Sequence, residues 1–356
     1  MNRARGRRSV LWRVASVLGI LLPVVSAWYA CDVPPAPGEW QLVQAIHRAE
    51  VSPAVLACMG GALPEQLPAA GTEGAEALLR QLRGVQLGWW AAMSGLCWLV
   101  ARQALGHPFP LFACALLALL GPVEAGGGVL RPEVPASVFG MLGVLLLQLL
   151  PGLRPPRVRR WARYNTLALV MTSGCALGMA IALCPASASW LLVPALLLLL
   201  VFAGLCLQTG RVLWRRGWPS VPLRAVGKRV LPWVLLPMSA MGSAVSILGA
   251  GSRVSPLTTM ESSLLPTGVT ASALVVLLAA AGGLILLFGI GTSLGRPRRL
   301  GAVIPMFACC AVQVLNGLMV PRGFDTTSAS VPLALLAAQG AALPLVAVLA
   351  VRGWKR

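Results

Sequence analysis

The side chains of this chain that could do chemistry include ten acids, two histidines and nine cysteines. Five of the acids stand close to or between long apolar runs and are candidate catalytic carboxylates: Asp32, Glu124, Glu133, Glu261 and Asp325. A carboxylate can act as a general base, so their convergence would suit an enzyme. Arginines occupy the same polar stretches and could hold a phosphate through paired hydrogen bonds: Arg131, Arg253 and Arg322.

Asp32 directly follows the first apolar run and precedes two segments that we expect to be short surface helices. This layout is similar to that of membrane glycosyltransferases that use polyprenyl-phosphate sugars, and it is confined to the N-terminal part of the chain. The resemblance implies an outward-facing transferase acting on a lipid-linked substrate. The chain departs from that family in having no paired acidic motif. The alternative is that the acids are solvated loop charges.

A second set of candidates is neutral and lies inside apolar runs, where it could bind a solute: Ser239, Ser243, Ser246, Gln313 and Asn316. The run 230–250 also contains Pro232, Pro237 and Gly242, which can break a helix and free backbone groups to hold a solute. The alternative is a kinked helix whose hydroxyls bond to neighbouring helices. No Asp, Glu, Lys or His falls inside an apolar run, which argues against coupling through an intramembrane carboxylate.

We expect no metal site and no cofactor. The sequence has no CxxC pair and no HExxH motif, and neither histidine lies in an apolar run. Cys31 and Cys58 share the one long polar segment and could form a disulfide in an oxidising compartment. Most of the other cysteines lie in apolar runs, where we expect them to be inert.

The elements that must position these residues are apolar helices. With 57% hydrophobic and 11% charged residues, the chain is expected to be an all-α, polytopic integral membrane bundle. The ten expected transmembrane helices are Val10–Ala30, Val85–Ala101, Pro108–Val123, Ala136–Leu153, Tyr164–Leu183, Trp190–Gln208, Val230–Ala250, Val269–Ile290, Gly301–Val320 and Pro332–Val351. The third is short, so residues 108–153 could instead form a re-entrant hairpin.

These helices divide the chain into five parts. Residues 1–30 form a basic segment and a signal-anchor helix, and residues 31–84 an extracytoplasmic loop with two short amphipathic helices. Transmembrane helices 2–6 occupy 85–208, a basic cytoplasmic loop 209–229, and helices 7–10 with a basic tail 230–356. The alternative for the first part is a signal peptide cleaved near Val25-Ser26-Ala27.

The distribution of basic residues predicts how the chain is oriented in the membrane. The loop 209–229 contains six basic residues and no acid, and such loops stay cytoplasmic. Both termini then lie in the cytoplasm, most of the 29 basic residues fall on that side, and all 10 acids fall on the other. The net charge of +19 is spread over short loops, so we expect anionic lipid headgroups rather than nucleic acid as the partner. Whether the chain assembles with another membrane protein or forms a homo-oligomer stays open.

The first functional expectation is a transporter or permease for a neutral or amphipathic small solute in the inner (plasma) membrane of a bacterium. The alternatives are the outward-facing transferase described above and a non-catalytic membrane subunit or scaffold. Whether the chain is an enzyme therefore stays open.

Overall fold

The computed structural model describes residues 2–32, 39, 43–44, 46, 58, 72–106, 109–120, 133–149, 160–183, 235, 238–244, 246, 277–285, 306, 310 and 333–341. Every element of regular secondary structure in these residues is a helix, so the all-α class is confirmed. Within these ranges, none of the helices combines the length and the apolar character that a membrane crossing requires.

Five helices are described over their whole length, and each overlaps an expected apolar run. They are α1 (Asn2–Cys31), α4 (Thr72–Ala104), α5 (Phe109–Leu120), α6 (Glu133–Gln148) and α7 (Arg160–Leu183). Helix α1 includes the basic N-terminal segment. Helix α5 has only 12 residues, in line with the short run from which it was expected.

Helix α4 differs from the expected organisation, because it runs without interruption across the boundary expected at residue 84. Its 33 residues join the expected second surface helix to the following apolar run. The stretch contains no proline and many Ala, Leu, Glu, Gln and Arg residues, so no side chain stops the helix. Glu76 and Arg80, one helical turn apart on α4, form an ion pair at 3.7 Å. The helix ends at Ala104, and Gly106 follows it with a φ of +79°, which glycine adopts at low cost.

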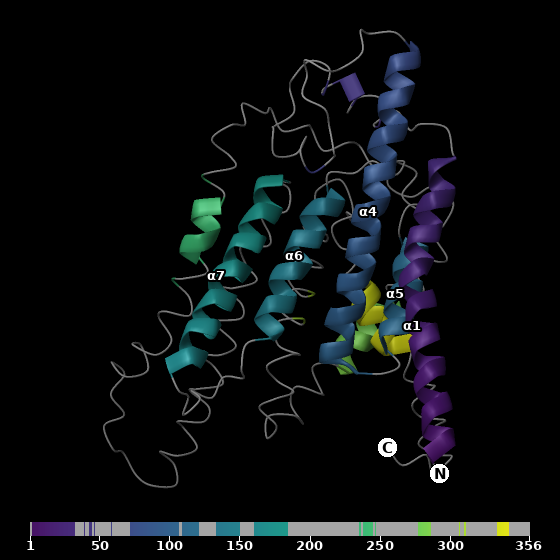
Figure 1. Ribbon diagram of the computed structural model, residues 1–356, viewed down its shortest axis with the longest axis vertical. Coiled ribbons are helices and arrows are strands. Elements are labelled where there is room, and N and C mark those ends of the chain that lie inside the picture. The colour runs from purple at the N-terminus through teal and green to yellow at the C-terminus, as the bar shows by residue number, and fades with distance from the viewer. Residues whose placement is uncertain are drawn as a thin grey trace.

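Helix α4 lies at the centre of the described fold. It packs on α1, α5 and α6, while α6 packs on α7 and α1 on α5. Figure 1 shows α7, α6 and α4 side by side, with α5 and α1 beyond α4. Large, fully buried side chains fill the spaces between these helices: Met93, Leu117, Met141 and Leu177.

Hydroxyl groups connect neighbouring helices. The Ser94 hydroxyl of α4 donates to the Ile20 carbonyl of α1 at 2.8 Å. The Ser26 hydroxyl of α1 donates to the Ala118 carbonyl of α5 at 3.2 Å. A third such bond links α7 to α6, from Ser173 to the Gly143 carbonyl at 2.9 Å. These serines are therefore used in helix packing.

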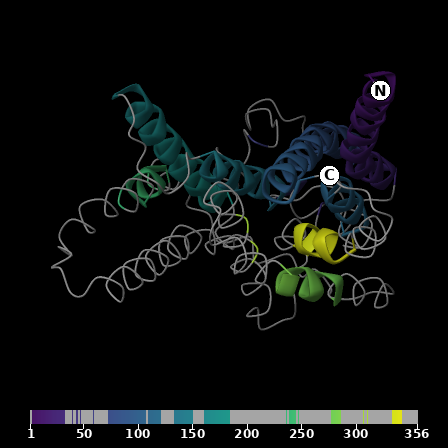
Figure 2. The same cartoon turned by 90° about the horizontal axis from the view of Figure 1, so that it is seen from below.

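Two segments from the C-terminal part, 277–285 and 333–341, also pack closely, and Figure 2 shows them side by side. A Cβ on Gly282 would overlap the Leu336 carbonyl, and a Cβ on Gly340 would overlap the Leu278 carbonyl. The contacts run in opposite directions along the chain, so the segments are antiparallel. Gly283 has nothing within 4 Å of its Cβ position. Of the adjacent glycines Gly282 and Gly283, only Gly282 therefore makes the close contact.

Candidate functional site

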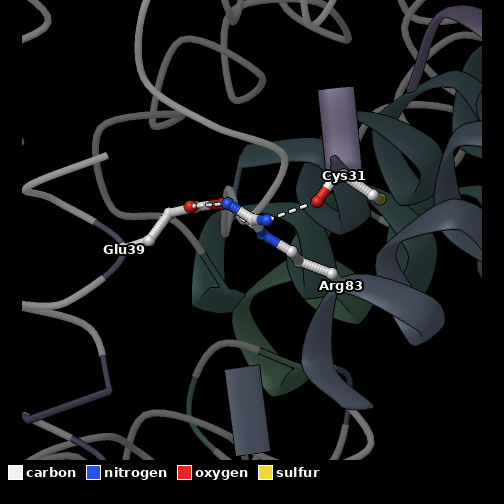
Figure 3. Close-up of polar contacts among 3 residues, drawn as sticks. All are labelled: Cys31, Glu39 and Arg83. Atoms are coloured by element: carbon white, nitrogen blue, oxygen red, sulfur yellow. Dashed lines mark hydrogen bonds and ion pairs between the residues drawn. The ribbon is translucent and has the colours of Figure 1, made fainter. Parts of the chain in front are cut away.

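The guanidinium of Arg83 on α4 forms hydrogen bonds with two other parts of the chain. Its Nη2 donates to Glu39 Oε2 at 2.5 Å and its Nε to Glu39 Oε1 at 3.4 Å. Its Nη1 donates to the Cys31 carbonyl at 2.6 Å (Figure 3). We call this arrangement of Arg83, Glu39 and the Cys31 carbonyl the outer clamp.

The outer clamp is buried and its charges are paired. The Glu39 side chain is fully buried and that of Arg83 is 8% exposed. Burial of a charge is unfavourable unless a partner compensates it, and here each carboxylate oxygen accepts a bond from the guanidinium. Cys31 is the last residue of α1, so its carbonyl has no partner within the helix. Arg83 satisfies this carbonyl and places a positive charge at the helix C-terminus.

A second contact joins α4 to the polar segment between α1 and α4, which also contains Glu39. The indole Nε1 of Trp89 donates to the Cys58 carbonyl, and the Trp89 ring lies 5.8 Å from that of Phe139 on α6. Glu39 and Cys58 are thus held by residues less than two turns apart on α4. Val43 and Ile46 of this segment are buried as well. The segment therefore contacts α4 at Glu39 and at Cys58.

The serines expected to bind a solute lie on one face of the segment 238–246. Ser239, Ser243 and Ser246 are exposed, whereas Ala240 and Met241 are buried. The buried face packs on α7, because a Cβ on Gly178 would lie 2.7 Å from both the Met241 carbonyl and the Ala244 Cβ. The Ser246 hydroxyl donates to the Gly242 carbonyl at 2.8 Å. The three serines thus form an uncovered hydroxyl face, which we call the serine face.

The carboxylates expected to be catalytic are mostly outside the part of the chain that the structure describes. Asp32 is described and exposed at the end of α1. Glu133 begins α6, and its side chain is not described. The remaining candidates lie outside the described residues: Glu124, Glu261, Asp325, Arg131, Arg253, Arg322, Gln313 and Asn316. The basic loop 209–229 lies outside them too.

Cys31 and Cys58 are free, partly exposed thiols, so the disulfide expected between them is not formed in this structure. Burial raises the pKa of the Cys31 thiol; the nearby Arg83 charge opposes this, and Asp32 and Glu39 add to it. Burial alone raises the pKa of Cys58. Both are therefore poor nucleophiles at neutral pH. Across the described ranges, no three or more His, Cys, Asp or Glu side chains form a cluster that could hold a metal ion.

Two features of the chain were not predicted from the sequence. Glu39 and Arg83 carry no local signal of their pairing. The stretch Gly291-Thr292-Ser293-Leu294-Gly295 matches the GxSxG pattern of hydrolase nucleophiles and could have been found from the sequence. That motif needs a strand before it and a helix after it, whereas here it follows an apolar run expected to be helical. It lies outside the described residues.

No protein-family model matches the chain, and no curated protein or solved structure is significantly similar to it. The case for a function therefore depends on the chain's own residues.

Proposed function

We propose that the chain is a polytopic helical membrane protein that transports a neutral or amphipathic small solute, without an intramembrane carboxylate. The orientation follows the basic residues, with both termini in the cytoplasm of a bacterial cell and anionic lipids at that face. The transport proposal depends mainly on one observation, the exposure of the three hydroxyl groups of the serine face.

The outer surface of α1 supports a lipid environment. It exposes large apolar side chains at spacings of four and three residues: Val14, Leu18, Leu21, Val25 and Trp28. Apolar faces of this extent mark contacts with a membrane or with another protein. Exposed aromatic side chains lie at both ends of the first apolar run, Trp12 at one end and Trp28 with Tyr29 at the other. This is the pattern of an interfacial aromatic belt.

The serine face supports a path for a neutral solute. A row of exposed hydroxyl groups can line a polar path through the protein. Such a lining can exchange hydrogen bonds with a solute and needs no charge. In the sequence, Pro237 directly precedes this segment, and proline has no backbone N–H to donate.

Cysteine substitution tests whether water reaches the serine face. Ser239→Cys and Ser243→Cys should react with a charged, membrane-impermeant thiol reagent in native membranes, as read by peptide mass. Leu21→Cys is the matched control, because Leu21 is exposed near the middle of the first apolar run. It should stay unreactive, since it faces lipid. If the serine positions are as unreactive as Leu21→Cys, the path does not exist.

Transport itself can be tested with purified protein in liposomes. Osmotic swelling in a panel of neutral solutes should be faster than in protein-free liposomes, and Ser239→Val with Ser243→Val should slow it severalfold. Thr172→Val on α7 is the control. Thr172 is also exposed and bonds only back to Ala168, so its loss should leave the rate unchanged. A swelling rate that the serine substitutions do not change would contradict the proposal.

A non-catalytic membrane subunit is the second candidate. The observation in its favour is that the hydroxyls of Ser26, Ser94 and Ser173 are all used between helices. In that case the serine face would be a contact for a partner helix. Swelling equal to that of protein-free liposomes with every solute, together with co-purification of a stoichiometric partner, would favour this candidate.

A further inference from the structure

The last turns of α4 bring an aromatic ring and a positive charge together. The Arg102 guanidinium lies over the Trp98 ring, with its Cζ 4.9 Å from the ring centroid. The two residues are one helical turn apart, so the helix itself makes them neighbours. Trp98 is only 9% exposed, whereas Arg102 is exposed. The pair therefore combines a buried donor with a charge that a ligand can reach.

The donors of this pair lack acceptors in the part of the chain that the structure describes. The indole Nε1 of Trp98 is buried and has no hydrogen-bond partner there. Arg102 belongs to neither of the two ion pairs found among these residues, which contain Arg80 and Arg83. The negative end of the helix dipole accounts for a positive charge in the last turn. It does not account for a buried indole N–H without an acceptor, which is uncommon in proteins.

We propose that Arg102 and Trp98 bind the phosphate of an anionic lipid headgroup. A guanidinium can hold two phosphate oxygens through parallel hydrogen bonds. The indole N–H supplies a further donor, and the ring holds the guanidinium in place through a cation–π contact. Both groups only donate, so the pair suits an anionic acceptor and repels a cation.

The position of the pair along the chain favours a lipid over a soluble phosphate. This step rests on the membrane topology proposed above, in which Arg102 directly follows the apolar run 85–101 at its cytoplasmic end. None of the ten acids is expected on that side, and anionic headgroups are concentrated there. Arg102 then lies in the headgroup layer, and Trp98 lies one turn deeper, where interfacial tryptophans are common.

Trp90 provides a comparison on the same helix. Its Nε1 also has no partner among the described residues, but Trp90 belongs to the apolar core cluster and Trp98 does not. The residue one turn after Trp90 is Ser94, whose hydroxyl donates to the Ile20 carbonyl of α1. Trp90 therefore has no neighbouring charge with which to hold a phosphate, and it serves as a control.

Native mass spectrometry of the delipidated, full-length protein in detergent tests the site. Arg102→Gln should bind dioleoyl-phosphatidylglycerol about tenfold more weakly than wild type, because hydrogen bonds from a charged donor are lost. Trp98→Phe keeps the ring but removes the N–H, so it should weaken binding severalfold. The matched controls are Arg80→Gln, at another exposed arginine of α4, and Trp90→Phe; both should bind as wild type does. Wild-type affinity in either Arg102→Gln or Trp98→Phe would overturn the proposal.

Further measurements use the wild type alone and do not require a variant to fold. Dioleoyl-phosphatidylcholine has the same phosphate but carries an ammonium group that Arg102 repels, so it should bind more weakly than phosphatidylglycerol. A photoreactive phosphatidylglycerol should label the peptide that contains Trp98 and Arg102. Equal binding of the two lipids, or labelling confined to other peptides, would overturn the proposal.

Inorganic phosphate distinguishes the two sources of the ligand. At the concentration of the lipid it should not displace phosphatidylglycerol, and displacement would assign the site to soluble phosphates and overturn the lipid. None of these measurements involves movement of a solute. Failure of the liposome swelling assay would therefore contradict the transport proposal alone, and failure of lipid binding would contradict this site alone.

Discussion

The guanidinium of Arg83 joins three parts of the chain: α4, the end of α1 and the polar segment that contains Glu39. Arg83→Met would remove the guanidinium that pairs with the buried Glu39 carboxylate. Loss of one partner from a buried pair costs about 3–5 kcal/mol, so the free energy of unfolding should fall by about that amount. Thermal or denaturant unfolding in detergent would measure it.

Arg80→Met is the matched control, because Arg80 also pairs with a glutamate on the same helix but is 81% exposed. Its effect should be no more than about 0.5 kcal/mol. The double variant Arg83→Met/Glu39→Leu should recover part of the lost stability, since no buried charge is left alone. A loss in Arg83→Met no larger than that in Arg80→Met would show that the outer clamp adds nothing to stability.

The thiols of Cys31 and Cys58 give a prediction about pH. Their pKa values are raised by burial, and only the thiolate reacts with alkylating agents. A raised pKa keeps the thiol protonated to higher pH. The alkylation rate of both should therefore be low at neutral pH and should still be rising above the ordinary thiol pKa of about 8.5.

The same chain unfolded in urea is the control for this profile, and its alkylation should rise at lower pH. Peptide mass mapping at a series of pH values would record both profiles. Identical profiles for folded and unfolded chains would contradict the burial effect. Alkylation of Cys31 and Cys58 that starts only after a reductant is added would show that the two form a disulfide.

The two glutamate–arginine pairs show what the sequence can predict about side chains. Glu76 and Arg80 are one helical turn apart, so their contact follows from the helix itself. Glu39 and Arg83 are 44 positions apart, and only the path of the intervening chain brings them together. The contact of Cys114 with the Ser94 carbonyl likewise depends on how α5 packs on α4. Spacing carries no information about such contacts.

The antiparallel contact of 277–285 with 333–341 depends on glycine. Gly282→Ala would force the new methyl group into the Leu336 carbonyl, and such overpacking costs about 1–3 kcal/mol. Gly283→Ala is the matched control. Its added methyl group meets open space, and alanine favours the helix, so stability should stay equal or rise by up to about 1 kcal/mol.

Unfolding midpoints of the two variants in the same detergent would compare them directly. If Gly282→Ala were as stable as Gly283→Ala, the close packing of Gly282 on the Leu336 carbonyl would be contradicted. Gly340→Ala should behave as Gly282→Ala does, because its Cβ would meet the Leu278 carbonyl.

The described helices follow the apolar runs closely, because hydrophobic content and the absence of proline are local properties. Their ends follow less well. Residues 72–84 were expected to form a separate helix because they are polar, but polarity alone does not end a helix. At Gly106 the sequence does carry an end signal, since a glycine precedes Pro108 by two residues.

The proposed orientation of the whole chain can be tested with reporter fusions. A fluorescent protein fused after Arg229 or Arg356 should be active, because both sites are expected in the cytoplasm. Alkaline phosphatase fused within residues 31–84 should be active, because it needs the outer compartment. Activity of both reporters at the same site, or the reverse pattern, would contradict the topology.

The neighbours of each helix were beyond prediction from the sequence. Hydropathy identifies apolar runs but does not say which run contacts which, because many Ala and Leu residues offer similar surfaces. The central place of α4 comes from particular fits, such as Met93 in the core and Ser94 against the Ile20 carbonyl. These depend on the shape of both partners.

The length of α4 has a mechanical consequence. A continuous helix of 33 residues measures about 50 Å, whereas the hydrocarbon core of a bilayer is about 30 Å thick. Arg83 fastens it to the end of α1 and to Glu39, and it also packs on α5 and α6. Such a rod transmits displacement from one end to the other. A molecule that pushed on the segment containing Glu39 would tilt α4 as a lever and shift its C-terminal end, near Arg102.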